Sequence, residues 1–226
     1  MKLTIEQIAQ IEETLILNGL VYQDVKLELL DHIASEIEEK MSNEEISFEL
    51  VYKSVFEKWK SSLVISSSSA WLGVFFQAPR VVVDKLISYS KRQTVIVLLS
   101  ALVFGFVLAL IVSNIQLEQT FNILSLGMRG ACLLLVLATS ISMFLIWNSK
   151  IKTTYGRLFL YRGWLLFLFI FQFNMISNPL KIFDINNSFW HNCINCFLLG
   201  FPFTYSIFQL TMAFEHHKIV KKLKFV

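Results

Sequence analysis

The chain has 226 residues, of which 55% are hydrophobic, and its mean hydropathy of +0.58 is too apolar for an ordinary soluble protein. Its charges are divided: residues 1–60 hold 13 acidic and 6 basic side chains, whereas residues 61–226 hold 4 and 14. The basic side chains stand beside apolar runs and form no single patch, so the net charge of +3 does not indicate nucleic-acid binding.

Residues 1–60 predict a small domain of three amphipathic helices. Thr4 and Gln7 have the spacing of a capping box, and Gly19 offers a stop, so the first helix is predicted between them. Ser42 and Glu45 predict a second capping box, which opens the third helix. The second helix, over 22–41, carries an apolar stripe of Val25, Leu29, Ile33, Ile37 and Met41, and the third carries Phe48, Tyr52, Val55, Phe56 and Trp59. A domain of this size has a small core, which is compatible with docking on the membrane part or with homo-oligomer formation.

The second helix also has an acidic face. We expect its side chains to point to solvent and to bind a protein partner, although a merely solvated face has the same composition. His32 stands four residues from both Glu28 and Glu36, a spacing found in surface ion pairs and also in pH-sensitive helices. The predicted interaction residues are Asp24, Glu28, Asp31 and Glu38.

Residues 24–60 contain the string ELLDHIASEIEEKMSNEEISFELVYKSVFEKW. It resembles the N-terminal helical module called HAAS, or permease prefix, which is typically attached to bacterial membrane segments. The resemblance implies a role in signalling or regulation. The Gly-Leu that commonly opens the module's second helix is replaced here by Lys40, Met41 and Ser42. The matching positions are Glu28, Leu29, Asp31, His32, Ile33, Glu44, Glu45 and Phe56.

Residues 61–92 are predicted to connect this module to the membrane part. The apolar piece 70–78 is too short to cross a bilayer, and it follows a serine run that suits a linker. Trp71, Phe75 and Phe76, followed by basic residues, are typical of an amphipathic helix at the membrane interface. The alternatives that this helix lies on the membrane and that it partly enters it both remain open.

Residues 93–226 predict a four-helix transmembrane bundle with a basic tail, with spans at 94–114, 127–147, 158–177 and 189–214. Of the 13 basic residues that we counted near the span ends, 11 lie on one side, so the N- and C-termini are predicted to be cytoplasmic. In the first span Ala101, Gly105 and Ala109 recur at intervals of four, which predicts a seam for close helix packing. Pro202 is expected to kink the fourth span.

Polar residues in the spans offer few candidates for chemistry. His191, Cys193 and Cys196 are of types that bind zinc or copper, but on a helix His191 points away from Cys193, and no fourth ligand is evident. We therefore expect no metal site there, and we expect no disulfide framework. Gln172 and Asn174 favour hydrogen bonds between helices, with a substrate path as the alternative.

The sequence contains no phosphate-binding glycine loop and no recognisable catalytic motif. We therefore expect an all-α, noncatalytic protein of the cell (inner) membrane without a cofactor, which acts in signalling, regulation or protein interaction. A small-molecule transporter or transporter subunit is the alternative. A membrane-embedded enzyme rests only on the cysteine and histidine cluster.

Overall fold

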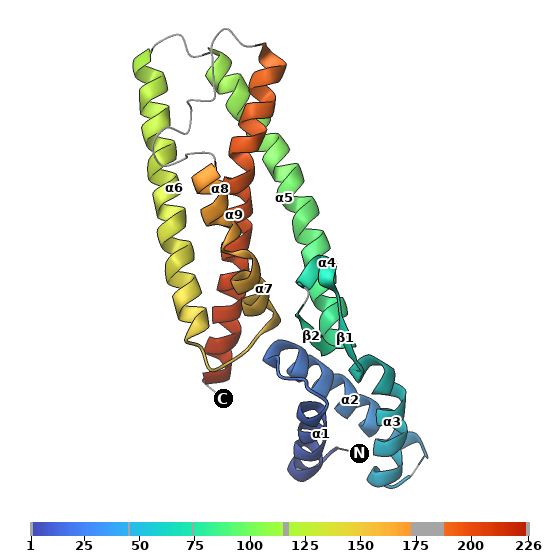
Figure 1. Cartoon of the computed structure of the whole chain (residues 1–226). Helices are drawn as coiled ribbons and strands as arrows, with labels where there is room; N and C mark the ends of the chain where they lie inside the picture. The colour runs from blue at the N-terminus through green and yellow to red at the C-terminus, as the bar shows by residue number, and fades with distance from the viewer. Residues whose placement is uncertain (1, 45, 74, 115–117, 173–187, 225–226) are drawn as a thin grey trace. The chain divides into compact units, whose positions relative to one another are not determined.

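The computed structural model describes all residues except 1, 45, 74, 115–117, 173–187 and 225–226. The described residues are almost entirely helical, with one small two-stranded sheet, which confirms the all-α part of the predicted fold class (Figure 1). They divide into two compact units. Unit 1 contains Met1–Ser90, Lys150–Arg157 and Ile219–Val226, and unit 2 contains Lys91–Ser149 and Leu158–Lys218.

Helix α1 of unit 1 spans Ile5–Leu17 and has the predicted start and stop. The Thr4 hydroxyl accepts a hydrogen bond from the Gln7 backbone N–H, and the Gln7 side chain accepts one from the Thr4 N–H, so the capping box is confirmed. Gly19 follows the helix with a φ of 83°, a conformation that costs a residue without a Cβ little.

Helices α2 (Gln23–Glu44) and α3 (Phe48–Leu63) complete the N-terminal helices. Val25, Leu29, Ile33 and Ile37 of α2 are buried, as the stripe predicted, whereas Met41 at its end is half-buried. The predicted start of the third helix was wrong. Ser42 lies inside α2, where its hydroxyl donates to the Glu38 carbonyl, and the N-cap residue of α3 is Ser47.

Between α3 and the next long helix, the structure differs from the expected single connector helix. Strands β1 (Ile65–Ser67) and β2 (Gln77–Pro79) pair antiparallel, with the short helix α4 (Ser69–Leu72) between them. The Arg80 N–H donates to the Val64 carbonyl at 2.9 Å and closes this hairpin. The serine run therefore forms a strand and the start of α4, because extended serines can use the partner strand for their backbone hydrogen bonds.

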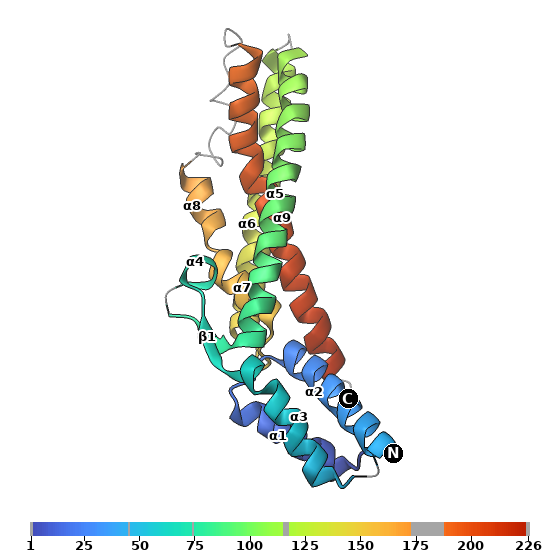
Figure 2. The ribbon, with the colours of Figure 1, turned by 90° about the vertical axis from the view of Figure 1, so that its right-hand side faces the viewer.

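Unit 2 is built mainly from parts of long helices. Helices α5 (Arg80–Asn114), α6 (Glu118–Trp147) and α9 (Phe189–Lys224) are long and apolar enough to cross a membrane, and their segments in this unit lie side by side (Figures 1 and 2). Helices α7 (Thr154–Arg162) and α8 (Leu165–Gln172) fall in the region of the third predicted span. The rest of that span, from residue 173 on, lies outside the described residues.

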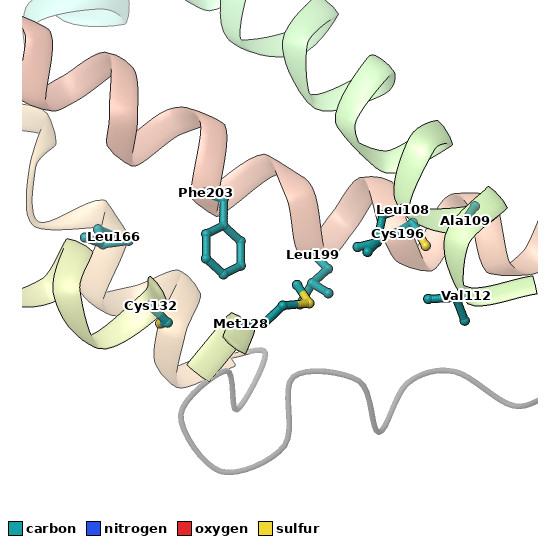
Figure 3. Close-up of a cluster of buried hydrophobic side chains, with 9 residues drawn as sticks. All are labelled: Leu108, Ala109, Val112, Met128, Cys132, Leu166, Cys196, Leu199 and Phe203. Carbon is teal, nitrogen blue, oxygen red and sulfur yellow. The ribbon is translucent and has the colours of Figure 1, made fainter. Parts of the chain in front are cut away.

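The interior of unit 2 contains two apolar clusters. The larger joins α5, α6, α8 and α9, and Figure 3 shows its side chains, Leu108, Ala109, Val112, Met128, Cys132, Leu166, Cys196, Leu199 and Phe203. The smaller consists of Ile146, Phe159 and Ala213. Many large apolar side chains also point outward from these helices, among them Leu102, Leu134 and Ile207. Apolar side chains both inside and outside are typical of a helix bundle surrounded by lipid.

Candidate interaction site at the start of helix α2

The N-terminus of α7 is capped twice, once by its own chain and once by α2. Thr153 is buried, and its hydroxyl accepts a hydrogen bond from the Gly156 N–H at 3.0 Å. Asp24, in the first turn of α2, accepts hydrogen bonds from the Thr154 N–H at 2.9 Å and from the Thr154 hydroxyl. A carboxylate at this end is favoured by the free N–H groups and by the helix dipole. Asp24 therefore holds the start of α7 from a distant part of the sequence.

Two further contacts within unit 1 hold segment 150–157. The Gln23 N–H donates to the Lys152 carbonyl at 2.9 Å. Tyr155 stacks on Tyr89 of α5 with ring centroids 5.1 Å apart, and their hydroxyl oxygens are 2.9 Å apart. Burial raises the pKa of Tyr155, and the hydrogen bond with Tyr89 raises it further, so Tyr155 remains a neutral hydrogen-bonding partner at physiological pH.

Two aromatic rings and one guanidinium group, those of Tyr22, Phe76 and Arg157, pack together near Asp24. The Tyr22 ring is 6.5 Å from the Phe76 ring, and the Arg157 guanidinium lies 5.3 Å from the centroid of Phe76. Burial raises the pKa of Tyr22; the positive charge of Arg157 opposes this and the negative charge of Asp24 adds to it. Contacts between a cation and a ring face strengthen when water is excluded. Segment 150–157 is thus held by a carboxylate, a tyrosine pair and a cation–π contact.

A groove of about 350 Å³ lies between α2, α3 and α5. An ion pair between Lys85 and Glu28 crosses its rim. The side chain of Lys85 is only 20% exposed, so this pair is more sheltered than a free surface pair. The groove combines apolar and polar walls, and it is lined by Val25, Glu28, Leu29, His32, Trp59, Val81, Lys85, Ser88 and Tyr89.

The four acidic residues predicted to form an interaction surface have different environments. Asp24 and Glu38 are half-buried, and Glu38 accepts a hydrogen bond from the Leu3 N–H at 2.9 Å. Glu28 is exposed but pairs with Lys85. Asp31 is exposed, and its side chain has no ion pair or hydrogen bond within the part of the chain that the structure describes. Asp31 is therefore the member of the set whose carboxylate faces solvent alone.

The small residues of the predicted seam lie at a close helix contact inside unit 2. Ala101, Gly105 and Ala109 are all buried. A Cβ added to Gly105 would lie 2.7 Å from the Cα of Phe197 in α9, a distance that real Cβ atoms essentially never show. A Cβ added to Gly200 would lie 2.6 Å from Cδ1 of Phe104. At this point only glycine permits the observed approach of α5 and α9.

The histidine and cysteine cluster is divided between two environments. His191 is exposed, whereas Cys196 is buried in the larger apolar cluster and Cys193 packs against that cluster. Among the described residues, no three His, Cys, Asp or Glu side chains stand close enough to hold a metal ion. Asn174 lies outside the described residues, as does the side chain of Gln172.

Sequence reasoning missed Thr153 and Thr154 at the start of α7. The pair Thr153-Thr154 precedes a helical pattern and is a recognisable N-cap signal. Its partner Asp24, by contrast, is 130 residues away in the chain, and no local pattern indicates that pairing.

Comparison with known proteins gave no match: no family model, no curated protein and no solved structure matches this chain.

Proposed function

We propose that the chain is a noncatalytic integral membrane protein whose N-terminal helices regulate the membrane helices through segment 150–157. The observation that supports this proposal is the capping of α7 by Asp24. Helix α7 continues through a short turn into the apolar helix α8. A change in the position of α2 would therefore act directly on the chain that leads into the third apolar segment.

The proposal includes four membrane spans, with the end of α7 from Leu158 on and all of α8 belonging to the third. Three candidate spans are long helices, and seven of the 8 residues of α8 are large and apolar. An even number of spans puts both termini on one side, and the distribution of basic residues favours the cytoplasmic side of a cell membrane. The resemblance of residues 24–60 to the HAAS module supports a signalling or regulatory role.

A protein partner would bind the acidic surface of α2 that solvent reaches. Asp31 and Glu39 are exposed on this helix, and Glu28 is exposed beside them. Exposed charges of one sign contribute little to stability, but they accelerate encounter with a basic partner and exclude acidic ones. In this proposal Asp24 transmits the signal and Asp31 receives it.

The coupling is tested by hydrogen–deuterium exchange on the full chain in lipid bilayers. Asp24→Asn should increase the exchange of the amides of residues 154–157, because a neutral side chain holds the helix end less strongly. Asp31→Asn makes the same change of charge on the same helix and is the matched control. Equal exchange at 154–157 in both variants would contradict the proposed coupling.

The partner is tested by placing a photo-crosslinking residue at Asp31 of the full chain in cells. We expect one defined protein adduct at this position and none at Leu134, which is 68% exposed on α6 and expected to face lipid. Reporters fused after Arg157 and after Val226 should both read cytoplasmic. An external signal after Arg157 would contradict the four-span arrangement.

A further inference from the structure

Helices α5 and α9 have a fixed antiparallel register within unit 2. Gly105 approaches the backbone of Phe197, and Gly200, three residues later in α9, meets Phe104 and Ala101, earlier in α5. Gln93 stands twelve residues before Gly105, and Gln209 stands twelve residues after Phe197. At 1.5 Å per residue, both glutamines lie about 18 Å from the glycine contact, in the same direction. The register therefore places them at the same level of the bundle.

Both glutamines lie on the buried seams of their helices. On α5, Gln93 is followed by the buried Val97 and Ala101 at steps of four, and on α9 Gln209 is followed by the buried Ala213. Gln93 is 6% exposed and Gln209 is 1% exposed. Two amide side chains therefore point into the interior of a bundle of apolar helices.

Helix α6 adds a hydroxyl at nearly the same level. Cys132 shares a cluster with Leu199, and Ile146 shares another with Ala213. In both pairs the number of the α9 residue exceeds that of the α6 residue by 67. The same difference relates Thr139 of α6 to Ser206 of α9, so these two residues lie at the same level. Thr139 is 1% exposed. A polar layer thus lies between the two apolar clusters, and it consists of Gln93, Thr139, Ser206 and Gln209.

Most hydrogen-bonding atoms of this polar layer lack partners. The Ser206 hydroxyl donates to the Pro202 carbonyl at 2.6 Å. The amide nitrogen and oxygen of Gln93 and the hydroxyl of Thr139 are buried and make no hydrogen bond with any described residue. The amide of Gln209 is buried as well, and the hydroxyl of Tyr205 interacts with it. An unsatisfied amide is strongly unfavourable where neither solvent nor lipid can bind it. At least four such atoms at one level need a common polar partner.

The chemistry of the polar layer defines that partner. Amide and hydroxyl groups both donate and accept, so they suit a small molecule that does the same. None of the four residues carries a charge, and an uncompensated ion in an apolar interior is very costly, so an uncharged partner fits them best. We propose that the polar layer is a binding site for water, and that Gln93 and Gln209 share the bound water across the seam between α5 and α9.

The test uses the full chain in lipid bilayers with ¹⁵N in the glutamine side chains, and solid-state NMR that detects magnetisation transfer from water. Signals are assigned by their loss in Gln93→Leu and Gln209→Leu, and the exposed Gln10 is the positive control. We expect transfer to the side-chain amides of both Gln93 and Gln209. Transfer to Gln10 without transfer to either buried glutamine would overturn the proposal.

Sharing of the water is tested by a second measurement, thermal unfolding of the two single variants and the double variant. Each single variant should lower the folded-to-unfolded equilibrium constant about tenfold, because it leaves the opposite amide with fewer partners. The double variant should recover part of this loss. Gln119→Leu, on the exposed surface of α6, is the matched control and should change neither signal nor stability. Strictly additive losses would overturn the shared site.

If a leucine variant does not fold, Thr139→Val replaces it, since valine matches the shape of threonine. This variant should reduce water transfer to Gln209 while the Gln10 signal is unchanged. Unchanged transfer to both buried glutamines in Thr139→Val would remove Thr139 from the polar layer and overturn its assignment.

Discussion

The two units of the protein place polar and apolar groups in opposite ways. In unit 1 the interior is mostly apolar, and charged groups such as Asp24 and Lys85 act at its edges, where they join segments far apart in the chain. In unit 2 large apolar side chains such as Leu134 cover the outside, and unpartnered amides lie inside. The surroundings explain the difference, because charged side chains are well solvated in water and poorly solvated in lipid. The residues that determine specific contacts are therefore paired charges in unit 1, and buried amides and glycines in unit 2.

The largest expected effect comes from putting a charge on the outside of each unit. Leu134 in unit 2 is 68% exposed, and Leu50 in unit 1 is 63% exposed. Leu134→Asp should reduce membrane integration, measured by resistance to carbonate extraction, because an aspartate at the centre of a span costs about 3 kcal/mol. Leu50→Asp should integrate like the wild type. Wild-type integration of Leu134→Asp would break the comparison.

A smaller loss is expected from adding one methyl group at the helix seam of unit 2. Gly105→Ala should destabilise the bundle by about 1–3 kcal/mol, because its Cβ meets the backbone of Phe197 rather than a movable side chain. Gly130→Ala on α6 is the matched control, since a Cβ there meets nothing within 4 Å. Thermal unfolding in detergent compares the two. Equal stability of both variants would show that the close contact is unimportant.

In unit 1 the tyrosine pair predicts an intermediate effect. Tyr155→Phe removes the bond between hydroxyl oxygens 2.9 Å apart and should cost about 1 kcal/mol, because the half-buried Tyr89 hydroxyl loses its partner. Replacing both tyrosines by phenylalanine should cost less than the sum of the single changes. Urea unfolding of the three variants measures this coupling, and simple additivity would argue against the pair.

The smallest effect concerns a charge at the edge of unit 1. Burial would raise the pKa of Glu36, but hydrogen bonds from Lys58 and Trp59 outweigh it, so the pKa lies below the ordinary value of 4.5. A lowered pKa stabilises the fold above pH 4.5, and this contribution is lost as pH falls through the lowered pKa. Glu36→Gln should therefore reduce the free energy of unfolding at pH 7 by less than about 1 kcal/mol, which lowers the melting temperature slightly.

The Glu36 measurement is a pH series of melting temperatures for the wild type and the variant. The difference between them should shrink toward acidic pH. Glu57→Gln, at a side chain that is 72% exposed, is the control and should show a smaller difference at pH 7. A difference in melting temperature that grows as the pH falls would contradict the stabilisation of the fold by ionised Glu36.

Sequence reasoning was most accurate where structure depends on neighbouring residues. The capping box of Thr4 and Gln7 and the buried stripe of α2 follow from side chains within a few positions of one another. Ser42 misled because the same serine can cap a helix or donate to a carbonyl four residues earlier, and α2 continues past it. Local spacing alone does not distinguish these two uses.

Contacts between distant residues were not predictable from local patterns. The pairing of Ile65 with Pro79 in the hairpin and of Asp24 with Thr154 depends on how the chain folds back. The glutamines of the polar layer were also missed. Gln93 lies at the edge of the first predicted span and Gln209 inside the fourth, and only the register of two packed helices shows that they lie at one level.

The closed hairpin of residues 65–79 has an evolutionary consequence. Its ends are joined by the hydrogen bond from Arg80 to Val64, so the end of α3 and the start of α5 remain together whatever the length of the chain between them. When the ends of a loop are held together, the entropy cost of closing it grows only slowly with the length of the loop. Homologues should therefore differ in length between these two positions more readily than at the tyrosine pair or the glycine contact. Their insertions and deletions should concentrate around Phe75, which is 98% exposed.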